Sequence, residues 1–121
     1  MAKDDYDVIA YRILVYLYAC FKHQIIYDED AFREAVRKNV ANDQHFYGIL
    51  FLMQEENLIR GLLFKKAWGG DRFLLSDLRE AEITADGIHY LKDNSTMKKI
   101  GDMMKEAGDM IATLASMIFF K

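Results

Sequence analysis

The feature that most constrains this sequence is an abrupt change of pattern at residues 55–61, Glu-Glu-Asn-Leu-Ile-Arg-Gly. Before it, residues 43–54 place apolar side chains at helical spacing, and after it an apolar stretch of strand length begins. Asn57 follows two acidic residues, which are unfavourable at the negative end of a helix dipole, and asparagine tolerates the left-handed conformation that ends many helices. We therefore expect the helix to end at Asn57 with a positive φ, in preference to one long helix over residues 43–64.

The elements after this stop have a recognisable order. Residues 58–66 predict a strand, residues 67–71 predict a glycine-rich turn, and a return strand whose register the pattern leaves open ends at Ile83. Thr84 is suited to cap a short helix over residues 85–93. Helix, hairpin and helix in this order predict a winged helix-turn-helix with a two- or three-stranded wing.

Two helices precede the central one. The first, capped by Asp4 and Asp5, extends to about Lys22 and is apolar on nearly all sides. A helix of this kind is buried on several sides, either at the centre of its own domain or beneath a partner chain. The second helix covers residues 29–38 and is capped by Asp28. A short turn joins it to the third helix, which gives a helix-turn-helix arrangement.

The last helix, residues 96–120, has the strongest period in the chain. Its apolar residues alternate at spacings of three and four, which is a heptad pattern over about three repeats. This seam consists of Met97, Ile100, Met104, Ala107, Ile111, Leu114 and Ile118. Its partner is either the first helix of the same chain or the same helix of a second chain, and we favour a homodimer. Residues 1–94 then form the winged-helix part and residues 95–121 the C-terminal helix of one mainly α (α+β) domain.

Composition restricts the class of protein. The chain has 121 residues, a net charge of −3, no proline and one cysteine, Cys20, within an apolar stretch. This suits a single globular domain in a reducing cytoplasm. The longest apolar run, residues 8–21, contains Arg12 and is shorter than a membrane span, and the acidic N-terminus does not resemble a secretory signal.

No group of residues predicts catalysis. His23, His45 and His89 lie on separate elements with no cysteine or carboxylate at metal-ligand spacing. The Gly69-Gly70 pair lacks the lysine and hydroxyl residue of a phosphate-binding loop. We expect no metal, no cofactor and no enzymatic activity.

Charge is distributed unevenly. Residues 60–79 hold 5 Lys/Arg against 2 Asp/Glu and are the only net-positive stretch, whereas the third helix has no Lys or Arg. Any DNA contact is therefore expected through the hairpin, with help from the start of the third helix. The predicted contact residues are Asn42, Gln44, His45, Arg60, Lys65, Lys66, Trp68 and Arg72. The outer face of the third helix, with Tyr47 and Phe51 expected to be exposed, predicts a protein contact instead.

The sequence resembles the YjcQ family of small bacterial and phage-borne winged-helix proteins. The resemblance is carried by residues 1–6 (MAKDDY), 16–20 (YLYAC), 55–61 (EENLIRG) and, most specifically, 83–99 (ITADGIHYLKDNSTMKK). The family tends to have glycine in place of Asn57 and proline in place of Ala85, and both substitutes meet the same backbone requirement. The resemblance implies the winged-helix fold, from which DNA binding is inferred, and it assigns no functional residues.

Two functions follow as hypotheses. The first is a cytoplasmic, non-enzymatic DNA-binding regulator of bacterial or prophage origin that acts as a homodimer, which the basic hairpin favours. The alternative is a protein-interaction module that retains the fold without binding DNA, which the acidic balance and the Tyr47/Phe51 face favour.

Overall fold

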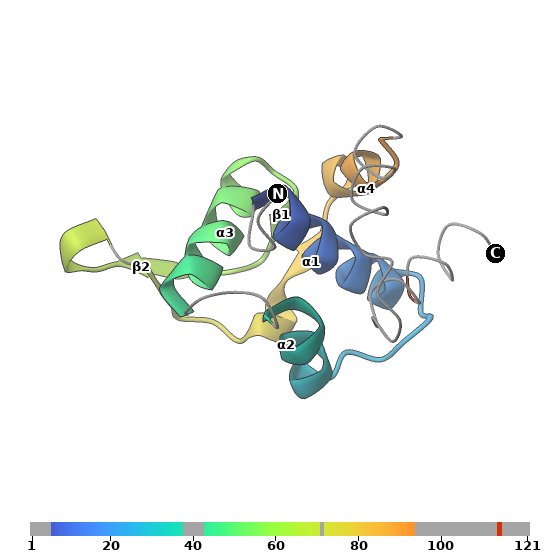
Figure 1. The fold of residues 1–121 in the computed structure, drawn as a ribbon, viewed down its shortest axis with the longest axis horizontal. Coiled ribbons are helices and arrows are strands. Elements are labelled where there is room, and N and C mark those ends of the chain that lie inside the picture. The colour runs from blue at the N-terminus through green and yellow to red at the C-terminus, as the bar shows by residue number, and fades with distance from the viewer. Residues whose placement is uncertain (1–5, 38–42, 71, 94–113, 115–121) are drawn as a thin grey trace.

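The computed structural model describes residues 6–37, 43–70, 72–93 and 114. Within them the chain is mainly helical, with two small antiparallel sheets (Figure 1). The elements are α1 (Tyr6–Phe21), α2 (Glu29–Arg37), α3 (Asp43–Glu55), β1 (Ile59–Arg60), β2 (Phe64–Lys66), the 3₁₀ turn η1 (Trp68–Gly70), β3 (Arg72–Leu74), the 3₁₀ turn η2 (Leu78–Glu80), β4 (Glu82–Ile83) and α4 (Ala85–Leu91). This order of helices, hairpin and helix is the predicted one.

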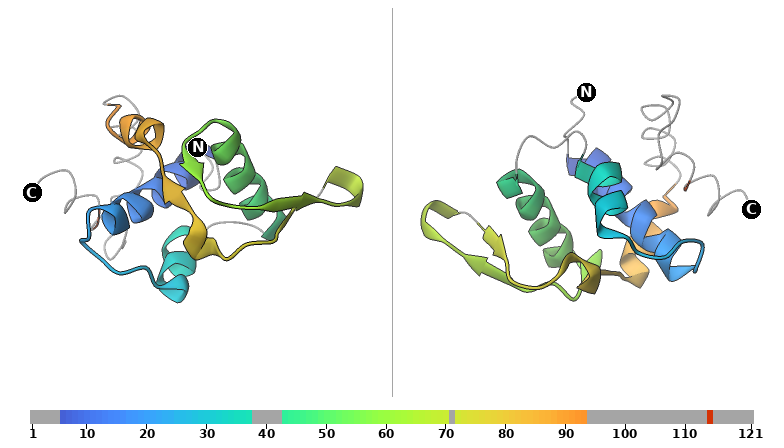
Figure 2. Two further views of the ribbon diagram at one scale, coloured as in Figure 1. Left: turned by 180° about the vertical axis from the view of Figure 1, so that it is seen from behind. Right: turned by 90° about the horizontal axis from the view of Figure 1, so that it is seen from below.

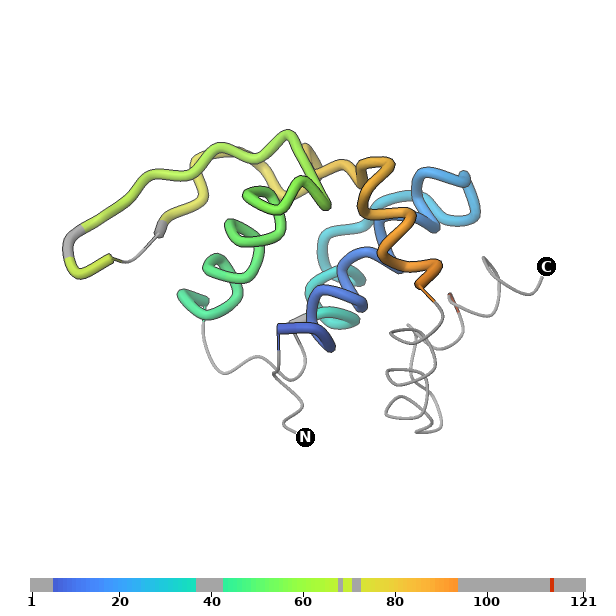
Figure 3. The backbone as a smooth tube through the Cα atoms, turned by 90° about the horizontal axis from the view of Figure 1, so that it is seen from above, coloured from blue at the N-terminus to red at the C-terminus, as the bar shows by residue number. Residues whose placement is uncertain are grey.

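Helix α1 lies at the centre of the molecule (Figures 2 and 3). Every side chain from Val8 to Ala19 is buried, and α2, α3, α4 and β4 all contact the helix. The prediction of a first helix buried on several sides is confirmed. Elements of the same chain supply the contacts, so this burial does not by itself require a partner.

Arg12 is the one charged residue in the buried part of α1, and it is only 4% exposed. Its guanidinium group donates to the carbonyl of Ala35 through Nε, at 2.8 Å, and also through Nη2. Ala35 lies in the last turn of α2, where carbonyl groups lack helical partners and carry a partial negative charge. The buried arginine therefore attaches the C-terminal end of α2 to α1.

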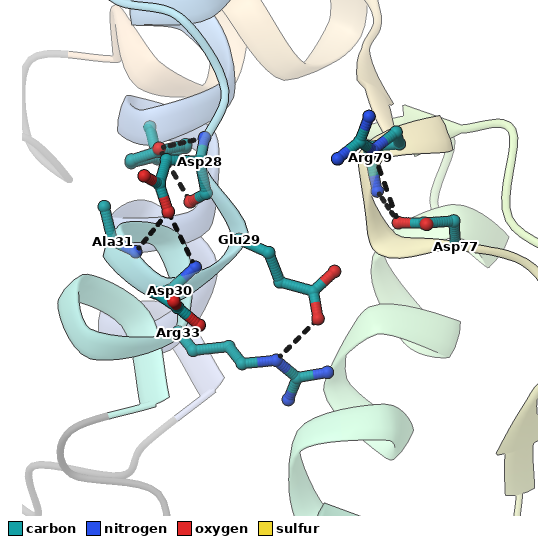
Figure 4. Close-up of polar contacts among 8 residues, drawn as sticks. Asp28, Glu29, Asp30, Ala31, Arg33, Asp77 and Arg79 are labelled. Carbon is teal, nitrogen blue, oxygen red and sulfur yellow. Dashed lines mark hydrogen bonds and ion pairs between the residues drawn. The ribbon is translucent and has the colours of Figure 1, made fainter.

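Asp28 caps α2 at its other end, as predicted. Its Oδ1 accepts hydrogen bonds from the backbone N–H groups of Asp30, at 2.9 Å, and Ala31, at 3.2 Å (Figure 4). The hydroxyl of Tyr16, on α1, donates to the carbonyl of Asp28 at 3.2 Å. Both ends of α2 are thus bonded to neighbours that fix its position on α1.

Helix α3 ends where the sequence predicts. Asn57 has φ of 64°, so the predicted positive φ is confirmed. The N–H of Leu58 donates to the carbonyl of Met53 at 2.9 Å, and the N–H of Asn57 donates to that of Gln54 at 3.0 Å. These two bonds form the Schellman motif, which satisfies the last carbonyl groups of a helix.

The stop of α3 is joined to the start of α4. Thr84 caps α4, as predicted, because its Oγ1 accepts from the N–H of Gly87 at 3.0 Å. The Thr84 hydroxyl in turn donates to the carbonyl of Asn57, whose Nδ2 donates to Oδ2 of Asp86 at 2.9 Å. Helix α4 is shorter than expected, since it ends at Leu91.

Residues 58–83, predicted to form a single hairpin, form two separate pairs of antiparallel strands. Strand β2 pairs with β3 in the register Phe64↔Leu74, and β1 pairs with β4 in the register Ile59↔Ile83. The turn η2 separates β3 from β4, and Asp77 caps it by accepting from the N–H of Arg79 at 3.0 Å. This interruption explains why the apolar residues of the return strand do not alternate evenly.

Leu114 is the only member of the predicted dimer seam among the described residues. It is 5% exposed and belongs to the same cluster of buried hydrophobic residues as α1. For this position the alternative of packing within the chain is therefore the observed one. The remaining seam positions lie outside the described residues; they are Met97, Ile100, Met104, Ala107, Ile111 and Ile118.

Among the described residues, no helix has both the length and the apolar character needed to cross a membrane.

Candidate nucleic-acid interface

The hairpin formed by β2, η1 and β3 projects beyond the helices (Figures 1 and 2). Gly69 and Gly70 form its turn with φ of 77° and 84°, which glycine adopts without strain. The N-terminal end of α3 lies on the same side of the molecule as the hairpin tip in every view (Figures 1, 2 and 3). The two parts of the chain predicted to contact DNA therefore share one end of the molecule.

The two faces of the hairpin differ. Phe64 and Leu74 are partly buried against the core, and the ring of Phe64 meets that of Phe51 on α3 at 5.5 Å and 89°. Lys65 and Phe73, which lie opposite each other in the register, are exposed on the other face. Alternation along the strands thus directs one set of side chains to α3 and the other to solvent.

The hairpin carries the predicted basic residues. Lys65 and Lys66 are exposed, and Lys66 lies opposite Arg72 in the register. Together with Ala67 and Phe73, the two lysines line an open depression of about 530 Å³. The side chains of Arg72 and of Trp68, in η1, are not among those that the structure describes.

Arg60, another predicted contact, lies elsewhere. It is in β1, at the base of the hairpin, and its Nε is 3.3 Å from Oε1 of Glu82 on β4. Its side chain lines a different depression, which it shares with residues of α1 and η2. The structure therefore separates Arg60 from Lys65 and Lys66.

The first turn of α3 holds two of the predicted base contacts. His45 is exposed and Gln44 is half-buried. Asn42, another predicted contact, lies outside the described residues. The positive dipole at a helix N-terminus favours a phosphate beside these side chains.

The expectation that Tyr47 and Phe51 are exposed is wrong. Both are half-buried, Tyr47 against the core and Phe51 against Phe64 of the hairpin. A helical wheel places Phe51 outward because it takes no account of a hairpin folded back over the helix.

Three large apolar side chains are exposed on the hairpin instead. Leu63 is 64% exposed, Phe73 48% and Leu75 64%. The N–H of Leu75 donates to the carbonyl of Leu63 at 2.8 Å, so these residues lie opposite each other, two positions from Lys65 and Phe73 on the same face. The sequence analysis did not predict this exposed apolar face, although the apolar run Phe73-Leu74-Leu75 indicates that apolar side chains lie on both faces of the strand.

Burial shifts the pKa values of several titratable groups in the part of the chain that the structure describes. Burial raises the pKa of the Cys20 thiol to about 11, so the thiol is protonated at neutral pH. Burial, followed by a hydrogen bond to a carboxylate, raises the pKa of Tyr6, which donates to Glu56, and of Tyr90, which donates to Asp7. No three His, Cys, Asp or Glu residues of this part are placed to hold a metal ion.

The chain matches a known protein family. A family model described as "YjcQ protein" matches residues 11–110, which is most of the chain. No curated protein and no solved structure matches the chain significantly.

Proposed function

The chain belongs to the YjcQ family, and we propose that it is a non-enzymatic winged-helix protein that binds double-stranded DNA. The observation that carries this proposal is the projecting hairpin, whose exposed Lys65 and Lys66 lie on the same side of the molecule as the N-terminal end of α3. In its fuller form the proposal is a cytoplasmic regulator of bacterial or prophage origin that acts as a homodimer.

The chemistry divides between the two elements. Lys65, Lys66 and Arg72 of the hairpin would neutralise backbone phosphates, which provides affinity without sequence preference. His45 and Gln44 of α3 would reach base edges, because glutamine and histidine carry the donors and acceptors that distinguish them. Since α3 has no Lys or Arg, most of the affinity is expected from the hairpin.

The test is DNA binding measured over a range of salt concentrations with fragments that flank the protein's own gene. With three or four phosphate contacts per protomer, a dimer would give a log–log salt slope of about −5 to −7. A Lys65→Ala/Lys66→Ala variant is expected to weaken binding to all sequences and to flatten the slope by up to about four units. A Gln44→Ala variant is expected to change sequence preference instead.

A charge-matched control distinguishes local contacts from net charge. The variant Arg33→Ala/Lys92→Ala removes two positive charges from α2 and from the end of α4, away from the hairpin (Figure 1). It is expected to keep nearly the wild-type slope. Equal losses in the two double variants, or no binding by wild type at about 50 mM salt, would overturn the proposal.

A second candidate is a protein-interaction module, which the exposed face of Leu63, Phe73 and Leu75 favours. Contiguous apolar surface of this kind marks contact sites between proteins. A photo-reactive amino acid at position 73 is expected to cross-link one defined partner, and a Leu63→Ser/Leu75→Ser background is expected to abolish that product. Cross-linking that survives these substitutions would contradict this candidate.

A further inference from the structure

A second depression, of about 240 Å³, lies between the end of α1 and the β1/β4 ladder, and the proposed DNA contact does not use it. Its floor is apolar, because Leu17 of α1 and Ile83 of β4 are both buried and line it, as does Ala81. The ring of Tyr27 also lines it. At this size the space is below the usual range for drug-sized ligands and suits a molecule with one ring or one short branched chain.

The rim of this depression is charged. Arg60 and Arg79 come from β1 and η2, and Glu82 of β4 is the only carboxylate among the lining residues that the structure describes. The guanidinium of Arg79 also lies over the ring of Tyr27, 5.9 Å from its centre. Each guanidinium group has one carboxylate partner, Glu82 for Arg60 and Asp77 for Arg79, so an anionic ligand would bind by replacing these partners.

The present partners of the two arginines are replaceable. The Nε of Arg60 is 3.3 Å from Oε1 of Glu82. The Nε of Arg79 is 3.8 Å from Oδ1 of Asp77 (Figure 4). The arginine side chains are 67% and 63% exposed, and ion pairs so exposed contribute little to stability. A ligand carboxylate would therefore bind the guanidinium groups without breaking a strong interaction, and arginine matches a carboxylate with two parallel hydrogen bonds.

We propose that this depression binds a small organic carboxylate with a single apolar or aromatic body. The body lies on the floor beside Leu17 and Ile83, and the carboxylate lies between Arg60 and Arg79. This site is independent of the hairpin, so neither proposal depends on the other.

Cys20 supplies a direct readout because it lines the depression and is the only cysteine of the chain. The experiment follows alkylation of Cys20 in the full-length protein by iodoacetamide at mildly alkaline pH, with hydrocinnamate as the probe. Hydrocinnamate is expected to slow alkylation in a saturable way. Phenethylamine, which has the same ring and linker but carries a positive charge, is expected not to slow it.

Arginine variants locate the contact. Arg60→Ala and Arg79→Ala are each expected to weaken protection by hydrocinnamate about tenfold, the loss of one charge-assisted contact. Arg33→Ala removes another arginine that pairs with a carboxylate, Glu29, but does not line the depression, and it is expected to leave protection unchanged. Ligand-observed NMR provides a readout that does not depend on the thiol. Equal protection by the amine, no protection by hydrocinnamate, or equal losses in all three variants would overturn the proposal.

Discussion

At Asn57 one residue meets two separate demands. Its backbone has φ of 64°, and its side chain donates to Asp86 at the start of α4. Glycine would satisfy the first demand at no steric cost, but it would lose the exposed hydrogen bond to Asp86. A β-branched residue would satisfy neither.

We therefore expect Asn57→Gly to change the free energy of unfolding by less than about 0.5 kcal/mol and Asn57→Val to lower it by roughly 1–2 kcal/mol. Chemical denaturation of the two variants beside wild type measures the difference. Equal stability of the glycine and valine variants would show that the left-handed backbone is not a constraint.

Substitution by alanine is expected to have opposite effects on stability at two helical glycines, Gly48 and Gly87. A Cβ at Gly87 would lie 2.3 Å from the carbonyl oxygen of Leu58, whereas a Cβ at Gly48 would have no atom within 4 Å. Gly87→Ala is expected to lower the free energy of unfolding by about 1–3 kcal/mol, because the backbone at Leu58 must move to accommodate the added Cβ. Gly48→Ala is expected to raise it by about 0.5–1 kcal/mol because alanine favours the helix. Denaturation midpoints that shift in the same direction would contradict this account.

The sequence predicted the element boundaries that are set by interactions between residues close together in the chain. The cap residues Asp28 and Thr84 and the stop at Asn57 each act on backbone groups a few positions away, so their patterns are visible in the sequence. The division of the return strand by η2 was not predicted. Gly61, with φ of 98°, lies against η2, where an added Cβ would meet the carbonyl oxygen of Glu80.

In the candidate sites, too, contacts between segments distant in sequence could not be predicted. The pair Arg60–Glu82 and the ring contact Phe51–Phe64 both depend on which segments become neighbours, and the sequence left that register open. The basic residues of the hairpin were identifiable because they follow one another in the chain. The depression beside Cys20 was not, because its lining comes from α1, β1, η2 and β4.

The attachment of α2 to α1 is testable at Arg12. Arg12→Met keeps an unbranched aliphatic side chain but removes the guanidinium group and both of its donors to the carbonyl of Ala35. Leaving a buried acceptor without this partner is expected to lower the free energy of unfolding by about 1–3 kcal/mol. Denaturation followed by circular dichroism measures this loss. A methionine variant as stable as wild type would show that the guanidinium group contributes no net stability.

At the scale of the whole molecule, Leu114 distinguishes packing within the chain from dimerisation. Because it is 5% exposed in a single chain, Leu114→Ala is expected to lower the free energy of unfolding by about 2–5 kcal/mol. Because the proposed homodimer uses other positions of the predicted seam, the denaturation midpoint of wild type is expected to rise with protein concentration. A midpoint independent of concentration, together with sedimentation as a monomer, would contradict the homodimer.

The central position of α1 also has a consequence for how the chain is made. The helix is synthesised before β4 and α4, which both contact it, and the hydroxyl of Tyr90 donates to Asp7 across 83 positions of sequence. Until residue 91 has left the ribosome, the most apolar segment of the protein has no complete cover. Until then the nascent chain exposes an apolar surface to which chaperones bind, and contacts this distant in sequence also slow the final folding step.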